Sequence, residues 1–79
     1  MRQPQPYSVP SYEFRILLEA QRKRLPAREV EAQDAIDLAL ARIRRGNYGI
    51  CIRCRHEIDR GRLKAFPTTE LCIACDAET

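Results

Sequence analysis

Four cysteines are the residues of this chain whose type and spacing point most directly to chemistry. They form two pairs, Cys51-Ile52-Arg53-Cys54 and Cys72-Ile73-Ala74-Cys75, which are separated by 17 residues. Two residues between ligands let one tight turn direct both sulfurs to a single ion, and this double C-x2-C spacing is typical of a tetrahedral four-thiolate zinc site. We therefore predict that one structural zinc ion is bound by Cys51, Cys54, Cys72 and Cys75.

Other uses of the cysteines stay open at this point. Two disulfides would fit an exported protein, but the chain opens Met1-Arg2-Gln3-Pro4 and shows no apolar signal-peptide run. A redox C-x-x-C motif needs a surrounding βαβ pattern, which is not apparent here. Thiolates also bind iron–sulfur clusters, although the symmetric spacing favours zinc. His56 follows Cys54 closely and could compete as a ligand, but with four cysteines available we expect it to stay outside the site.

A site with four protein ligands has no open coordination position, so the metal is expected to be structural rather than catalytic. The sequence also shows no Ser/His/Asp set, no glycine loop for phosphate and no obvious carboxylate pair. An enzyme is therefore not expected.

The elements that would position the cysteines differ along the chain. Residues 1–10 carry three prolines and no apolar periodicity, so we interpret them as a flexible Pro/Gln-rich tail. Residues 11–45 follow a helical pattern that breaks near residues 25–27, because Pro26 cannot lie inside a helix. Residues 46–79 alternate glycine, cysteine and single apolar residues. The expected fold is small and mainly α: an antiparallel helical hairpin followed by a treble-clef or ribbon-like zinc finger with four cysteine ligands.

Apolar residues at helical spacing predict the faces that the two helices bury. The stripe of the first helix is interrupted by Gln21 and consists of Phe14, Leu17, Leu18 and Leu25. The second helix is expected from about Pro26 to Arg45, and its stripe, widened by Leu40, consists of Ala32, Ile36, Ala39 and Ile43. Gly46 follows two arginines and is a favourable helix stop, since glycine tolerates positive φ.

The finger should bury its own small set of apolar residues. Tyr48 and Ile50 are placed to cover one side of the metal. The predicted core of the finger consists of Ile58, Leu63, Ala65 and Phe66.

The residues around the cysteines also match a known pattern. They are Gly46-Asn47-Tyr48-Gly49-Ile50-Cys51-Ile52-Arg53-Cys54, then Ile58, then Arg62-Leu63-Lys64-Ala65-Phe66-Pro67, and finally Cys72-Ile73-Ala74-Cys75. This series resembles the DksA/TraR family of bacterial zinc-finger proteins, and it includes positions other than cysteine. Arg55 departs from the pattern, because the family usually has glycine there. A positive φ at Arg55 would cost on the order of 1 kcal/mol.

The resemblance implies a function. Proteins of this family bind bacterial RNA polymerase rather than promoter DNA, place a helical hairpin in its secondary channel and regulate initiation. Longer members carry an acidic motif, D-x-x-D-x-A, at the hairpin tip. The string Asp34-Ala35-Ile36-Asp37-Leu38-Ala39 fits that motif, but it lies inside the second helix rather than at the expected turn. We therefore interpret Asp34 and Asp37 as ordinary solvated residues that match by coincidence.

The expected turn near Pro26 is basic on one side, with Arg22-Lys23-Arg24, and carries no aspartate. The charged residues kept as candidates for partner binding on the hairpin are Arg22, Lys23, Arg24, Asp34 and Asp37. RNA polymerase is the implied partner of a cytoplasmic protein that is expected to be a monomer rather than a dimer. No membrane segment is apparent in the sequence.

Two alternatives to a polymerase-binding regulator are kept. The first is a small nucleic-acid-binding zinc module, whose basic surface would consist of Arg42, Arg44, Arg45, Arg53, Arg55, Arg60, Arg62 and Lys64. The second is a structural protein-interaction module. The formal net charge is +3 with neutral cysteines, and four thiolates with one Zn²⁺ bring it to about +1. Direct DNA binding is therefore not expected, and a protein partner is favoured.

Overall fold

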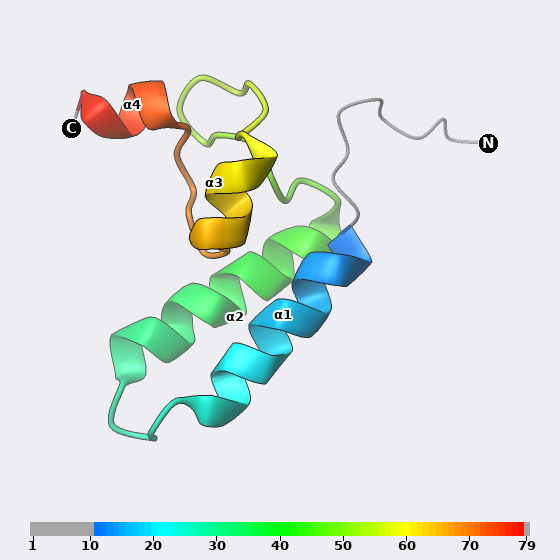
Figure 1. Ribbon diagram of the computed structural model, residues 1–79, viewed down its shortest axis with the longest axis vertical. Coiled ribbons are helices and arrows are strands. Elements are labelled where there is room, and N and C mark those ends of the chain that lie inside the picture. Colours follow the sequence, from blue (N-terminus) through cyan, green and yellow to red (C-terminus); the bar gives the residue numbers. More distant parts are fainter. Residues whose placement is uncertain (1–10, 79) are drawn as a thin grey trace.

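The computed structural model describes residues 11–78, so the predicted flexible tail at residues 1–10 lies outside the described residues. Four helices follow one another along the chain: α1 (Ser11–Arg24), α2 (Val30–Arg45), α3 (Arg60–Ala65) and α4 (Ile73–Ala77). Figure 1 shows α1 and α2 side by side as an antiparallel hairpin, with α3, α4 and their loops on the side of the hairpin formed by α2. The predicted fold class is confirmed: the structure is small, mainly α, and joins a hairpin to a cluster of four cysteines.

The hairpin is held by a few large apolar side chains. Phe14 and Leu18 of α1 are buried, as are Ile36 and Ala39 of α2. Burial of each large side chain contributes about 1.5–3 kcal/mol. Leu17 was predicted on the same stripe, but that prediction is wrong, since 38% of its surface is exposed. Phe14 and Leu18 are four residues apart and share a face, which turns Leu17 to the edge of the interface.

The hairpin turns between Leu25 and Glu29. The second helix begins at Val30 rather than near Pro26, so the predicted start is corrected by about one turn. The carbonyl of Pro26 closes the turn by accepting hydrogen bonds from the Glu29 backbone N–H at 3.0 Å and from Gln33 Nε2 at 3.1 Å. Pro26 therefore acts as a turn residue, and its missing N–H costs nothing there.

The second helix ends as predicted. Gly46 has φ of +83° and lies in the left-handed region, where a side chain would be strained. Its N–H donates to Ile43 O at 3.1 Å, and the Asn47 N–H donates to Arg42 O at 3.0 Å. These two bonds satisfy carbonyls of the last turn and redirect the chain into the first cysteine pair.

The hairpin and the finger share one apolar core. The rings of Phe14 and Tyr48 pack with centroids 5.5 Å apart, which joins α1 to the segment that leads into the cysteines. The same cluster includes Cys51, Cys75 and two of the residues predicted for the core of the finger, Ile58 and Leu63. The first helix therefore supports the metal centre directly, although the sequence suggested two separate units.

The other two residues predicted for the core of the finger, Ala65 and Phe66, are exposed, so that part of the prediction is wrong. Helix α3 has six residues and directs only Leu63 into the core. Phe66 follows the end of α3, is 60% exposed, and lies 5.9 Å from the Arg62 guanidinium. Among residues 11–78, no helix combines the length and the apolar character needed to cross a membrane.

Candidate metal centre

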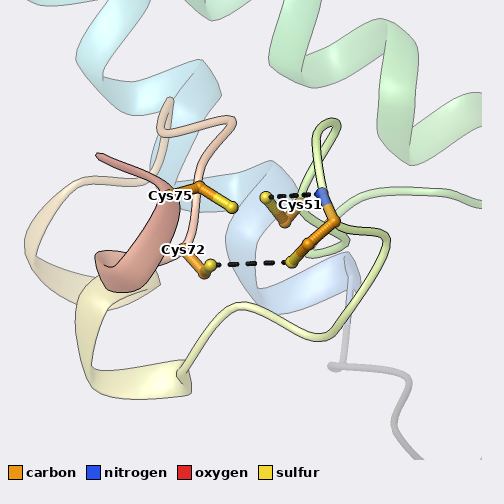
Figure 2. A group of neighbouring side chains, drawn as sticks. Cys51, Cys72 and Cys75 are labelled. Atoms are coloured by element: carbon orange, nitrogen blue, oxygen red, sulfur yellow. Dashed lines mark hydrogen bonds between the residues drawn. The ribbon is translucent and has the colours of Figure 1, made fainter. Parts of the chain in front are cut away.

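The four cysteine sulfurs converge on one point. All four Sγ atoms lie within 4.8 Å of one another, and Figure 2 shows those of Cys51, Cys72 and Cys75 turned toward a common centre. The Cys54 and Cys72 sulfurs are 3.7 Å apart, and all four cysteines are free rather than in disulfides. Zinc–sulfur bonds of about 2.3 Å in a tetrahedron separate two sulfurs by about 3.8 Å. The donor set therefore fits one tetrahedral zinc ion.

The first cysteine pair lies on a tight turn closed by backbone bonds. The Arg55 N–H donates to Cys51 O at 3.0 Å, and the Cys54 N–H approaches Cys51 Sγ at 3.5 Å. A short antiparallel bridge between Ile50 and Glu57 holds the two ends of this turn together. These backbone contacts fix the positions of both sulfurs before the chain continues to α3.

The second pair belongs to a helix. Cys72 is the N-cap residue of α4 and Cys75 lies within that helix, where the Asp76 N–H donates to Cys72 O at 2.9 Å. One cysteine pair thus lies on a turn and the other at the start of a helix, which matches the expected treble-clef-like or ribbon-like finger. His56, the possible competitor, is exposed and lies outside the cysteine cluster.

Arg55 takes the strained backbone conformation that the sequence suggested. Its φ is 68°, and it is the one non-glycine residue with positive φ in the described part of the chain. The left-handed conformation lets the chain leave the knuckle while the Arg55 N–H still reaches Cys51. Glycine would adopt it without a steric penalty.

The thiols differ in how readily they ionise. The Cys54 backbone N–H beside Cys51 stabilises its thiolate and lowers the pKa of Cys51 to about 5. Burial, with the neighbouring thiols, raises the pKa of Cys75 to about 12. Four thiolates do not form together without a cation, so zinc binding is coupled to the release of protons.

Tyr48 connects the start of the finger to its return segment, residues 66–71, which leads from α3 to the second cysteine pair. Its hydroxyl donates a hydrogen bond to Pro67 O at 2.7 Å, and burial raises its pKa to about 12. The nearby Arg42 opposes that shift only in part. The buried hydroxyl is satisfied as a donor, so the neutral phenol is the form that the fold requires.

Two arginines attach the return segment to the helices, and sequence reasoning had assigned both to a basic surface. Arg42 of α2 is buried, with Nη1 3.0 Å from Glu70 Oε2 and Nη2 3.4 Å from Thr69 O. Arg62 of α3 donates through Nε to Leu71 O at 3.0 Å. Arg42 lies three residues beyond the buried Ala39, so helical periodicity was the available signal for its inward position.

The candidate partner-binding residues lie along the hairpin, outside the metal centre. Arg22 and Asp37 form a two-pronged ion pair across the hairpin, with bonds of 2.7 and 3.0 Å. This contact lowers the pKa of Asp37 and raises that of Arg22. Lys23, Arg24 and Asp34 are exposed. Asp37 is thus engaged with α1 rather than free at a tip.

Comparison with known proteins identifies the centre. Residues 46–78 match the family described as the prokaryotic dksA/traR C4-type zinc finger. The chain carries a DksA/TraR-type zinc finger. The family resemblance of the motifs is confirmed, and the cofactor of this finger is a structural zinc ion that ties its two knuckles together.

Parts of the chain also match curated proteins. An "Uncharacterized protein" of Aquifex aeolicus (strain VF5) is 46% identical over 50 residues, which are 63% of this chain and 34% of that protein. The RNA polymerase-binding transcription factor DksA of Buchnera aphidicola subsp. Acyrthosiphon pisum (strain APS) is 42% identical over 40 residues, 51% of this chain and 26% of that protein. The matches therefore span about a third and a quarter of the length of these relatives.

The likeness extends to the hairpin in three dimensions. The solved structure of the RNA polymerase binding protein and transcriptional regulator Dks from Chlamydia trachomatis L2 (LGV434) superposes with a TM-score of 0.71 at 27% identity. The match covers 85% of this chain and 83% of that chain. This chain thus shares its fold with Dks over most of its length.

Proposed function

We propose that this protein is a small bacterial transcription regulator that binds RNA polymerase through its helical hairpin, near the secondary channel. The observation that carries the proposal is the single core that joins the hairpin to the DksA/TraR-type finger. A hairpin supported in this way keeps a fixed direction relative to the finger. Two proteins that are similar to this chain in sequence or in fold are described as RNA polymerase-binding proteins.

The hairpin has a free end suited to contact with a partner. Figure 1 places the turn between α1 and α2 at the end of the hairpin away from the finger. Lys23 and Arg24 are exposed beside this turn, and Asp34 is exposed on the first part of α2. At 1.5 Å per residue, the 16-residue α2 is about 24 Å long, so the arm reaches only a short distance.

This hairpin should act on the polymerase differently from a hairpin with an acidic motif at its tip. The turn at residues 25–29 carries no aspartate, and Asp34 begins the D-x-x-D-x-A string only after α2 has started. Asp37 is paired with Arg22. We propose that the exposed charges Lys23, Arg24 and Asp34 contact the polymerase, while Arg22 and Asp37 keep the two helices in register.

The nucleic-acid-binding alternative has weaker support. Of the eight basic residues proposed for its surface, three are held in internal ion pairs: Arg42 with Glu70, Arg60 with Glu13, and Arg62 with Asp76. Phosphate contacts would give an affinity that falls steeply with salt. Binding to DNA that is weak or nearly independent of salt would remove this alternative.

A site-specific cross-linking experiment tests the proposal. A photoreactive amino acid is introduced at Ala27, in the turn, and in a matched variant at Lys64, an exposed residue of α3. Each zinc-loaded protein is mixed with bacterial core RNA polymerase and irradiated. The variant at Ala27 should cross-link to the polymerase more strongly than the variant at Lys64, and a known secondary-channel binder should suppress the cross-link.

The outcomes separate binding from orientation. If neither variant cross-links and the wild-type protein does not retain polymerase at micromolar concentration, the proposed function is wrong. If only the Lys64 variant cross-links, the protein binds polymerase through its finger, and the role proposed for the hairpin is wrong.

A further inference from the structure

An open apolar groove lies on the hairpin at the level of its turn, away from the metal centre. It has a volume of about 330 Å³. Its lining comes from the end of α1, the first half of α2 and the loop between α3 and α4, and consists of Gln21, Arg24, Leu25, Ala32, Ala35, Ile36 and Thr68. Pockets for small molecules occupy about 300–1,000 Å³. The groove lies at the lower end of this range, which is enough space for one or two side chains of a partner.

The groove forms where α1 carries a polar residue in its apolar stripe and the facing positions of α2 carry small side chains. On α1, Gln21 interrupts the apolar stripe that begins with the buried Phe14 and Leu18. On α2, the facing positions are Ala32 and Ala35, which leave space that a larger side chain would fill. Ile36 forms an apolar part of the lining and is only 3% exposed.

The charge of the groove indicates what it accepts. Arg24 is the one charged residue among those that line it. The four ion pairs of residues 11–78 leave Arg24 out, whereas Arg22 in the same turn is paired with Asp37. The lining is thus largely apolar and carries a guanidinium, which binds carboxylates with two parallel hydrogen bonds.

From this arrangement we infer that the groove is a specific docking site for a polymerase segment in which an apolar side chain lies beside a carboxylate. The inference rests on the proposed function and adds to it the position and chemistry of the contact. The apolar side chain enters between Ala35 and Leu25, and the carboxylate pairs with Arg24. A small apolar contact combined with one ion pair would fix the position of the hairpin on its partner.

Two substitutions on the hairpin test the groove without changing any residue of the finger. Ala35→Leu fills it with a residue that favours a helix, and Arg24→Glu reverses its charge. The matched controls are Ala20→Leu and Arg15→Glu, which make the same changes at exposed positions of α1 outside the groove. The dissociation constant of each zinc-loaded protein for bacterial core RNA polymerase is measured, and thermal melting checks that each variant folds.

Wild-type binding, with at least tenfold weaker binding by both groove variants and less than twofold change in both controls, supports the inference. Equal binding by all variants overturns it while leaving the proposed function intact. A control Arg15→Glu that weakens binding as much as Arg24→Glu also overturns it, because general charge attraction would then suffice. A lack of wild-type binding overturns both proposals. A concentration-dependent dimer that Ala35→Leu abolishes assigns the groove to a second copy of the chain, which again contradicts the inference.

Discussion

Replacing Arg55 with glycine should stabilise the finger, although it removes a side chain. Arg55 has φ of 68°, a left-handed conformation that costs residues with a Cβ about 1–2 kcal/mol. Glycine removes this strain and keeps the backbone N–H that donates to Cys51 O. The greater freedom of glycine in the unfolded chain takes back about 0.4–1 kcal/mol. The net gain should be about 0.5–1 kcal/mol.

Thermal melting of the zinc-loaded protein measures this gain. In a domain of this size, 1 kcal/mol shifts Tm by about 4–8 °C, so Arg55→Gly should raise Tm by about 2–8 °C. Arg55→Ala is the matched control, since it removes the same charge but keeps the Cβ. Arg55→Ala should not raise Tm. An equal rise in both variants would show that charge, rather than backbone strain, is responsible, and a fall in Arg55→Gly would refute the strain itself.

Two further predictions concern the core and the metal. The pKa of Tyr48 is raised to about 12, so its contribution to stability is complete below pH 10 and is lost between pH 10 and 12. The unfolding free energy of Tyr48→Phe should fall less steeply over that range, and an identical slope would contradict the role of Tyr48. Removal of zinc by a chelator should abolish the near-UV circular dichroism and amide dispersion of the finger and lower the helical signal of the hairpin. An apo protein with unchanged spectra would refute the coupling between the metal and the core.

The sequence was sufficient for the parts of the fold that depend on spacing. The two cysteine pairs predict a four-sulfur site because C-x2-C geometry is local, and Gly46 predicts the end of α2 because positive φ is a property of one residue. The sulfurs converge as that spacing implies. Helix stripes likewise predicted that Phe14, Leu18, Ile36 and Ala39 are buried.

Predictions failed where tertiary contacts decide between equivalent apolar residues. Phe66 is larger than Leu63, yet Leu63 is buried and Phe66 is 60% exposed, because the short α3 presents one residue to the core. Pro26 was correctly expected to break the helix, but whether it lies in a turn or at a helix start depends on the partners of its carbonyl. The open groove could not be expected from either stripe alone, since it requires Gln21 of α1 to face the alanines of α2.

Because the apolar core is small, arginine ion pairs provide further contacts between segments that are distant in the sequence. Each of the four ion pairs in the described chain uses an arginine and joins segments at least 14 residues apart. Solvent screens the exposed pairs of Arg22 and Arg60, so these two residues chiefly align their helices. Arg42 differs because its guanidinium is buried, and loss of Glu70 would leave that charge without its carboxylate. Zinc fixes the knuckles, the shared core attaches them to α1, and Arg42 holds the return segment on α2. The direction of the hairpin, which the proposed contact with polymerase requires, therefore depends on the metal as well as on the helices.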